Sequence, residues 1–147
     1  RLVECADMTT RIIDVGAGDI MERAGRFGAI DPLLWGALLQ ALSAAAAYRR
    51  EVGPIVEKDA ALNFIFLSST FPRSIKYFVR ETRKELMRLN NHDLAIRAVE
   101  RLRRRLARLD AEHFTSGELH DYIDDFQMQL TSLDAAIQAT WFSWENT

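Results

Sequence analysis

The segment from Ser68 to Ser74 constrains the fold most, because an apolar stretch ends there and a long charged segment follows. Thr70 can cap a helix, and Pro72 suits a first helical turn, where its missing N–H costs no hydrogen bond. Downstream, mostly apolar residues return every three or four positions, at Ile75, Phe78, Val79, Thr82, Leu86 and Leu89. This spacing predicts a helix that starts near Pro72 and buries one side.

Similar periodicity along the chain predicts an all-α fold, a bundle of five to six helices. A first amphipathic helix over 1–15 should end at Gly16 and Gly18, with a loop over 19–30 that contains at most a short helix over 19–24. A second helix should begin at Asp31, continue to Gly53 and occupy the centre, because it has almost no polar side.

Two later segments complete this prediction. Residues 59–67 could form a strand by composition, but no second strand is available to pair with them, so a helix is preferred. A helix over 93–109 carries apolar residues at helical spacing. Thr115 and Glu118 have the spacing of a capping box and predict the start of the last helix. Its apolar stripe ends near Trp141 and consists of Leu119, Tyr122, Phe126, Leu130, Leu133 and Ile137.

The composition fits a single helical domain over residues 1–147, since 48% of the chain is hydrophobic. The formal net charge of −2 argues against a general polyanion binder and against strong attraction to membranes. The charges are nevertheless segregated: residues 73–108 hold 12 Lys and Arg against 4 Asp and Glu, a net charge of +8, and residues 109–147 hold 8 acids and no Lys or Arg. We expect the basic and acidic parts to face each other or two different partners.

Cysteine use and hydropathy bear on location. The single Cys5 cannot form an internal disulfide, which predicts a reducing, cytoplasmic environment. No apolar run reaches the roughly 18 residues of a membrane-spanning helix. The chain opens on Arg1, inside a helical pattern, so we expect it to be part of a longer polypeptide.

Two groups of charged residues are candidate sites. Glu4, Asp7, Arg11 and Asp14 form a stripe on the first helix that could position a cation, although a solvated surface with ordinary ion pairs is the preferred interpretation. Arg49, Arg73 and Arg80 could converge on a carboxylate or phosphate, although surface arginines are again preferred.

A third group is an arginine stripe on the helix over 93–109. It could follow phosphates or receive an acidic partner, and its members are Arg97, Arg101, Arg104, Arg105 and Arg108. No aromatic residue is interleaved, and a solvated face partly paired with the acidic last helix is the preferred interpretation. Nucleic-acid binding is the weakest alternative because the whole chain is slightly acidic.

The motifs of common catalytic and metal sites are missing from the sequence. There is no Glu-x-x-His, and the nearest pairs, Asp110 with His113 and His120 with Asp124, are weak metal signals. The sequence has no phosphate-binding Gly-rich loop and no Gly-x-Ser-x-Gly, and Cys5 has no nearby His. We therefore assign no catalytic residue, no metal site and no cofactor.

Four stretches together resemble the bacterial alpha-E family: RLVECADMTTRIIDV, LLWGALLQALSAAAAYRR, FLSSTFPRSIKYFVRE and LHDYIDDFQMQL. They occur in family order over nearly the whole chain, which is similar to the C-terminal half of a duplicated helical protein. Glu4 matches a family glutamate, Tyr48 and Arg49 a Tyr-Arg pair, and Pro72, Arg73 and Ser74 a Pro-Arg-Ser motif.

Two departures from the family pattern favour a structural or docking role over catalysis. Cys5 stands where the family usually has Arg, and Ser68 and Ser69 stand where many members have Asp-Pro. The resemblance implies a non-catalytic helical module that works with an ATP-grasp amide ligase and a transglutaminase-like peptidase in peptide modification.

The alternative is an enzyme domain or a pocket that binds a small peptide or an amino acid, in which Glu4 and Asp7 hold an amine and Arg49 or Arg73 holds a carboxylate. Glu4 and Arg73 are each the charged residue of a family-matching stretch on a different helix, so we expect them to approach each other across the bundle, where burial would make the pair costly to break.

Overall fold

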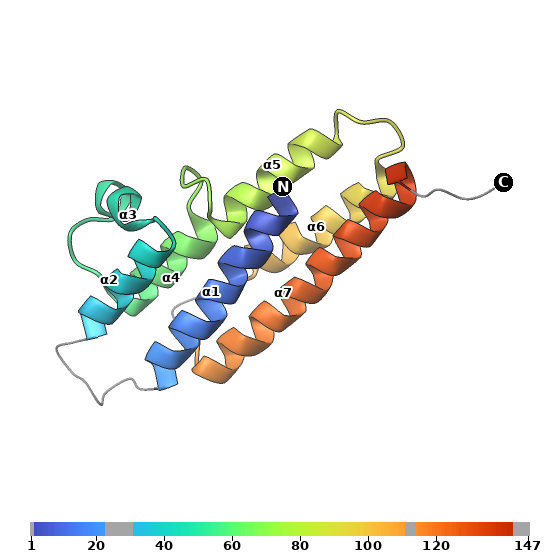
Figure 1. Cartoon of the computed structure of the whole chain (residues 1–147). Coiled ribbons are helices and arrows are strands. Elements are labelled where there is room, and N and C mark those ends of the chain that lie inside the picture. Colours follow the sequence, from blue (N-terminus) through green and yellow to red (C-terminus); the bar gives the residue numbers. More distant parts are fainter. Residues whose placement is uncertain (1, 23–30, 111–113, 143–147) are drawn as a thin grey trace.

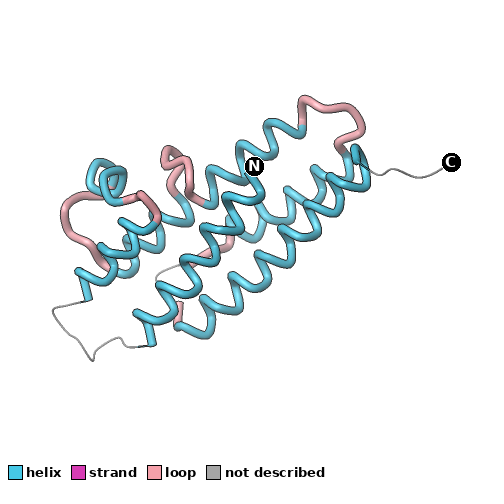
Figure 2. The backbone as a smooth tube through the Cα atoms, in the orientation of Figure 1, coloured by secondary structure: helices cyan, strands magenta, loops and turns pink. Residues whose placement is uncertain are grey.

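A computed structural model describes residues 2–22, 31–110 and 114–142, which contain seven α-helices, one π-helical turn and no strand. Figure 2 shows these helices and the loops between them. The all-α prediction is confirmed, although the number of helices exceeds the expected five to six. The elements are α1 (Leu2–Glu22), α2 (Asp31–Ala41), α3 (Ala45–Glu51), α4 (Lys58–Leu67), α5 (Ile75–Leu86), α6 (Asp93–Ala107), α7 (Ser116–Ile137) and the π-helical turn η3 (Gln138–Phe142).

Helices α1, α5, α6 and α7 form an antiparallel four-helix bundle (Figure 1). α1 packs against α5 and α7, and α6 packs against the same two helices, so the four helices surround one core. Consecutive helices α5, α6 and α7 alternate in direction (Figure 1). α2 packs on α1 and α4, and α3 follows α2 at the same end of the bundle.

The core follows the predicted apolar stripes. Seven apolar residues are buried in it, with relative exposures of 6% or less: Leu38, Leu42, Phe64, Phe78, Leu102, Phe126 and Leu130. An aromatic cluster joins α4 to the start of α7, because the Phe66 ring lies 5.7 Å from that of Tyr122 and 6.5 Å from that of Phe114. This cluster packs Tyr122 of α7 against Phe66 of α4, near the candidate site described below.

The expected end of the first helix at Gly16 and Gly18 is wrong, because α1 continues to Glu22. A methyl group added to Gly16 would lie 2.7 Å from Cδ1 of Leu38 on α2, too close for normal packing. Gly16 therefore serves the close approach of two helices. Residues 23–30 of the expected loop lie outside the described residues.

The buried side of α1 is also rotated from the one its apolar residues predict. Met8 and Val15 are 65% and 75% exposed, whereas Thr9 and Thr10 are buried. The Thr10 hydroxyl donates to the backbone oxygen of Ala6 at 2.9 Å, so its burial leaves no unpaired donor. The side of α1 that is buried is therefore set by its packing against α7, and the apolar pattern of the sequence does not predict it.

The single second helix expected over 31–53 is divided into α2 and α3. Ser43 has φ 57°, a left-handed conformation that stops α2 and redirects the chain. Gly53, with φ 137°, follows α3 as expected of a helix-ending glycine. The division explains the additional helix.

α5 begins later than predicted, and a different residue caps it. Ser74, not Thr70, is the N-cap: its hydroxyl oxygen accepts the Tyr77 N–H at 3.1 Å and its O–H donates to the backbone oxygen of Ser68. Thr70 instead donates to the Glu51 carboxylate at 2.8 Å. Pro72 lies in the turn before the helix and not in its first turn.

Other local predictions are confirmed. Residues 58–67 form the helix α4, as preferred over a strand. Thr115 and Glu118 make the reciprocal capping box of α7. No described helix is long and apolar enough to cross a membrane.

Candidate partner-binding face

Helix α6 separates apolar and basic side chains by its own periodicity. Ala95, Ala98, Val99, Leu102 and Leu106 are buried in the bundle. Four arginines at spacings of four, three and four residues are exposed on the other side, and we call them the arginine face: Arg97, Arg101, Arg104 and Arg108. Burial of one side of α6 thus forces these four cations outward.

Arginines next to this face are already paired. Arg83 and Arg103 both bind Glu100, each at 2.7 Å, and Arg105 Nε lies 2.8 Å from Asp125 Oδ2 on α7. The hydrogen bond from Arg103, followed by the one from Arg83, lowers the pKa of Glu100. The Arg105–Asp125 pair is a contact of the expected kind between the basic segment and the acidic end.

The arginine face has no such partner. Arg97, Arg101, Arg104 and Arg108 make no side-chain hydrogen bond or ion pair with any residue in the described parts of the chain. Exposed arginines retain their full charge and their capacity for bidentate binding. The four side chains therefore remain available to an external anion.

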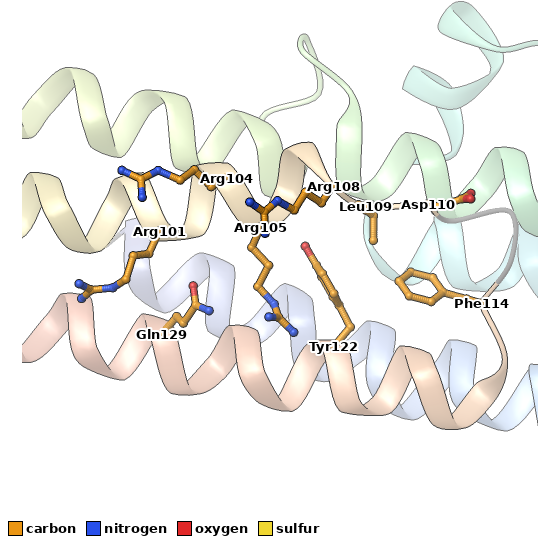
Figure 3. A pocket seen from close by; sticks show the side chains of 9 residues that line it. All are labelled: Arg101, Arg104, Arg105, Arg108, Leu109, Asp110, Phe114, Tyr122 and Gln129. Carbon is orange, nitrogen blue, oxygen red and sulfur yellow. The ribbon is translucent and has the colours of Figure 1, made fainter.

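A hollow of about 500 Å³ lies between α6 and α7, and Figure 3 shows the side chains around it. α6 and the residues after it contribute Arg101, Arg104, Arg105, Arg108, Leu109 and Asp110, and the other side contributes Phe114, Tyr122 and Gln129. Three members of the arginine face thus border a cavity that also has apolar and aromatic walls.

A second, larger groove lies on the other side of α6, against α5. It has a volume of about 1000 Å³ and a partly apolar surface that includes Val79, Met87 and Leu106. Its basic side chains are Lys76, Arg80, Arg83, Lys84 and Arg103. Arg80 Cζ lies 5.0 Å from the centre of the Tyr77 ring, a cation–π contact. Cations therefore border both sides of α6.

The candidates of the first helix lie on a different edge of the bundle. Glu4 is exposed, and Arg11 pairs with Asp7 at 3.0 Å as an ordinary surface ion pair four residues apart. The expected buried pair of Glu4 and Arg73 is wrong, because both side chains are exposed. Arg73 instead donates to the backbone oxygen of Leu42 at 3.5 Å.

The remaining candidates matched by resemblance have structural contacts. Tyr48 is fully buried, and its hydroxyl donates to the backbone oxygen of Ile55 at 2.8 Å; burial raises its pKa. Ser74 caps α5, and Arg49 is exposed beside Pro54 and Val56. Apart from Asp7 with Arg11, no hydrogen bond or ion pair among the described residues joins two of the seven candidates Glu4, Asp7, Arg11, Tyr48, Arg49, Arg73 and Ser74.

A cluster of one histidine and two aspartates joins α1 to α7, and it consists of Asp14, His120 and Asp124. His120 Nδ1 lies 2.9 Å from Asp14 Oδ1, and His120 Nε2 lies 3.2 Å from Asp124 Oδ2. One ligand atom from each of the three residues could lie around a cation, but the exposed imidazole already directs each ring nitrogen at a carboxylate. This is the geometry of a doubly hydrogen-bonded imidazolium. His113, of the other pair considered, lies outside the described residues.

Sequence reasoning missed the second wall of the hollow. It placed Tyr122 in the apolar stripe of α7 and did not consider Phe114 or Gln129. Tyr122 does follow that stripe, with 9% exposure, and only its position beside the arginines of α6 makes its hydroxyl relevant to a site. The one sequence signal that could have identified Tyr122 as a site residue is the hydroxyl at the end of a core aromatic side chain.

The structure is an antiparallel helical bundle with a basic face, whose four arginines have no partner among the described residues. The chain belongs to the Alpha-E family, whose model matches residues 1–142 and is described as "a predicted alpha-helical domain with a conserved ER motif". No curated protein and no solved structure matches the chain.

Proposed function

We propose that this domain is a non-catalytic docking module that binds an acidic protein surface through the arginine face of α6. The observation that carries the proposal is the stripe of four exposed arginines without a partner among the described residues, next to arginines that are paired. Unpaired surface cations add complementarity and speed to association with an acidic surface. The groove between α5 and α6 extends the basic face and offers apolar area.

An acidic protein fits these observations better than nucleic acid does. The net charge is −2, and exposed acids of α1 and α7 would repel a long polyanion. A protein can instead present a limited acidic patch to one face. From the family resemblance, we propose an ATP-grasp amide ligase and a transglutaminase-like peptidase as the partners.

The test is co-purification of these two partners with the triple variant Arg101→Glu, Arg104→Glu and Arg108→Glu. Binding should be lost while the helical circular-dichroism spectrum stays unchanged. The matched control is Arg11→Glu, Arg49→Glu and Arg50→Glu, which makes the same change of charge at exposed positions away from α6. The control should retain binding, and added salt should weaken the wild-type complex because exposed charges are screened beyond about 8 Å at physiological ionic strength.

Equal loss of binding in both triple variants would contradict a specific arginine face and indicate a general charge effect. Normal partner binding by the α6 variant, together with wild-type binding to short nucleic acids at moderate salt, would favour nucleic-acid binding instead.

A further inference from the structure

The hydroxyl of Tyr122 is an unpaired polar group inside the hollow between α6 and α7. Tyr122 is 9% exposed, and its oxygen is buried without a hydrogen-bond partner among the described residues. Buried hydroxyl groups in folded proteins nearly always have a partner, which is a protein group, an ordered water or another bound species. This oxygen therefore points to a ligand independently of the arginines.

The surroundings of this hydroxyl favour an anion. The guanidinium of Arg105 lies 5.1 Å from the centre of the Tyr122 ring, and its Nε forms an ion pair with Asp125 Oδ2 at 2.8 Å without the geometry of a hydrogen bond. In Figure 3 the hydroxyl points from α7 toward α6, into the region of the Arg108 side chain. Arg108 is exposed and has no partner in the described chain, so its side chain can move to admit a ligand.

We infer that this hollow binds an oxyanion, either a carboxylate or a phosphate, that is attached to an apolar or aromatic group. The Tyr122 O–H donates to the oxyanion, and Arg108 supplies charged N–H donors. Leu109 and Phe114 form the wall that contacts the apolar part. A volume of about 500 Å³ suits a small molecule or one side chain of a larger partner.

The protonation state of Tyr122 agrees with its role as a donor. Burial raises the pKa of its phenol to about 12, so the O–H is intact at neutral pH. Arg105 opposes this rise and Asp125 adds to it. The side-chain oxygen of Gln129 is also buried without a partner among the described residues, but it is an acceptor and cannot donate a hydrogen bond to an anion.

Calorimetric titration of the chain with defined probes tests this inference. The probes are inorganic phosphate, phenyl phosphate and 3-phenylpropionate, with neutral 3-phenylpropanol as the control. We expect saturable binding of at least one aromatic anion, and the tighter of the two identifies phosphate or carboxylate as the preferred group. Binding of neither aromatic anion, or equally tight binding of the neutral alcohol, would overturn the inference.

Three variants separate a ligand contact from a structural role. Tyr122→Phe and Arg108→Gln should each weaken binding of the preferred probe by at least about tenfold, the usual effect of losing a hydrogen bond to a charged group. Arg97→Gln is the matched control, since Arg97 is exposed on the same helix but does not line the hollow, and it should bind normally.

The unfolding temperature of the free Tyr122→Phe variant distinguishes a ligand-binding hydroxyl from a structural one. Loss of a structural hydroxyl would lower this temperature. Tyr122→Phe removes an unpaired buried polar atom, so the free variant should unfold at the same temperature as the wild type or higher. A lower unfolding temperature, or wild-type affinity for the probe, would overturn the assignment. Because Tyr122→Phe leaves every arginine in place, failure here is distinguishable from failure of protein docking.

Discussion

His120 Nδ1 lies 2.9 Å from Asp14 Oδ1, which joins α7 to α1 across 106 residues of sequence. The hydrogen bond and charge of Asp14 raise the pKa of His120 above its ordinary value, and Asp124 adds to the effect. A histidine whose pKa is higher in the folded than in the unfolded protein stabilises the fold when protonated. The pair therefore makes the α1–α7 interface depend on pH.

The His120→Gln variant should reveal this dependence. Its unfolding temperature should be lower than that of the wild type below about pH 6.5, where the histidine is protonated even in the unfolded chain. The difference should shrink as pH rises through the elevated folded pKa, because the wild type then loses the charge. Thermal melts between about pH 5 and 8.5 measure it, and a difference independent of pH would contradict the charged pair.

Substitution of two glycines in α1 separates helix propensity from packing. Gly18→Ala should stabilise the protein by about 0.5–1 kcal/mol, because no atom lies within 4 Å of the added methyl group and alanine favours a helix. Gly16→Ala gains the same propensity but pushes against buried Leu38, and overpacking of a core costs about 1–3 kcal/mol. Denaturant unfolding should place Gly16→Ala below Gly18→Ala in stability. Equal stabilisation would show that Leu38 moves aside freely.

Loss of the α5 cap should be costly. Ser74→Ala removes a buried hydroxyl that accepts from Tyr77 and donates to Ser68, so we expect a loss of about 1–3 kcal/mol in the free energy of unfolding. The control Thr70→Ala removes an exposed hydrogen bond to Glu51 and should cost less than about 1 kcal/mol. Chemical denaturation distinguishes them, and a larger effect at Thr70 would restore Thr70 as the important residue of this junction.

Two substitutions in α7 test its packing. Phe126→Ala should destabilise by about 3–5 kcal/mol, because this side chain is 1% exposed and its removal leaves a cavity. Met128, two residues later, is 70% exposed, and Met128→Ala should change stability by less than about 0.5 kcal/mol. Urea unfolding of both variants gives the comparison, and similar values would contradict the orientation of α7.

Features that depend on sequence neighbours were predictable. The capping box of Thr115 and Glu118 involves positions three residues apart, and the buried stripe of α7 follows from helical spacing. The exposure of Arg97, Arg101 and Arg104 likewise follows from burial of the opposite side of α6. In each case a single helix supplies all the information, so the pattern alone is sufficient.

Predictions from residue type alone failed where contacts with another segment of the chain determined the local structure. Gly16 has the identity of a helix end, yet it lies inside α1 because Leu38 packs against it. Thr70 and Ser74 are both good caps, but Thr70 donates its hydroxyl to Glu51 on α3, and Ser74 caps α5. Glu4 and Arg73 have opposite charges and match the family, yet remain exposed.

The sequence by itself determined that this chain forms amphipathic helices and that one of them carries a row of arginines, because periodicity and side-chain charge are local properties. Only the tertiary structure decided that Tyr122 would direct an unpaired hydroxyl toward those arginines and that Asp14 would meet His120. The physical reason is that a binding site requires groups from different helices at contact distance, and their relative rotation is fixed by packing of the whole core.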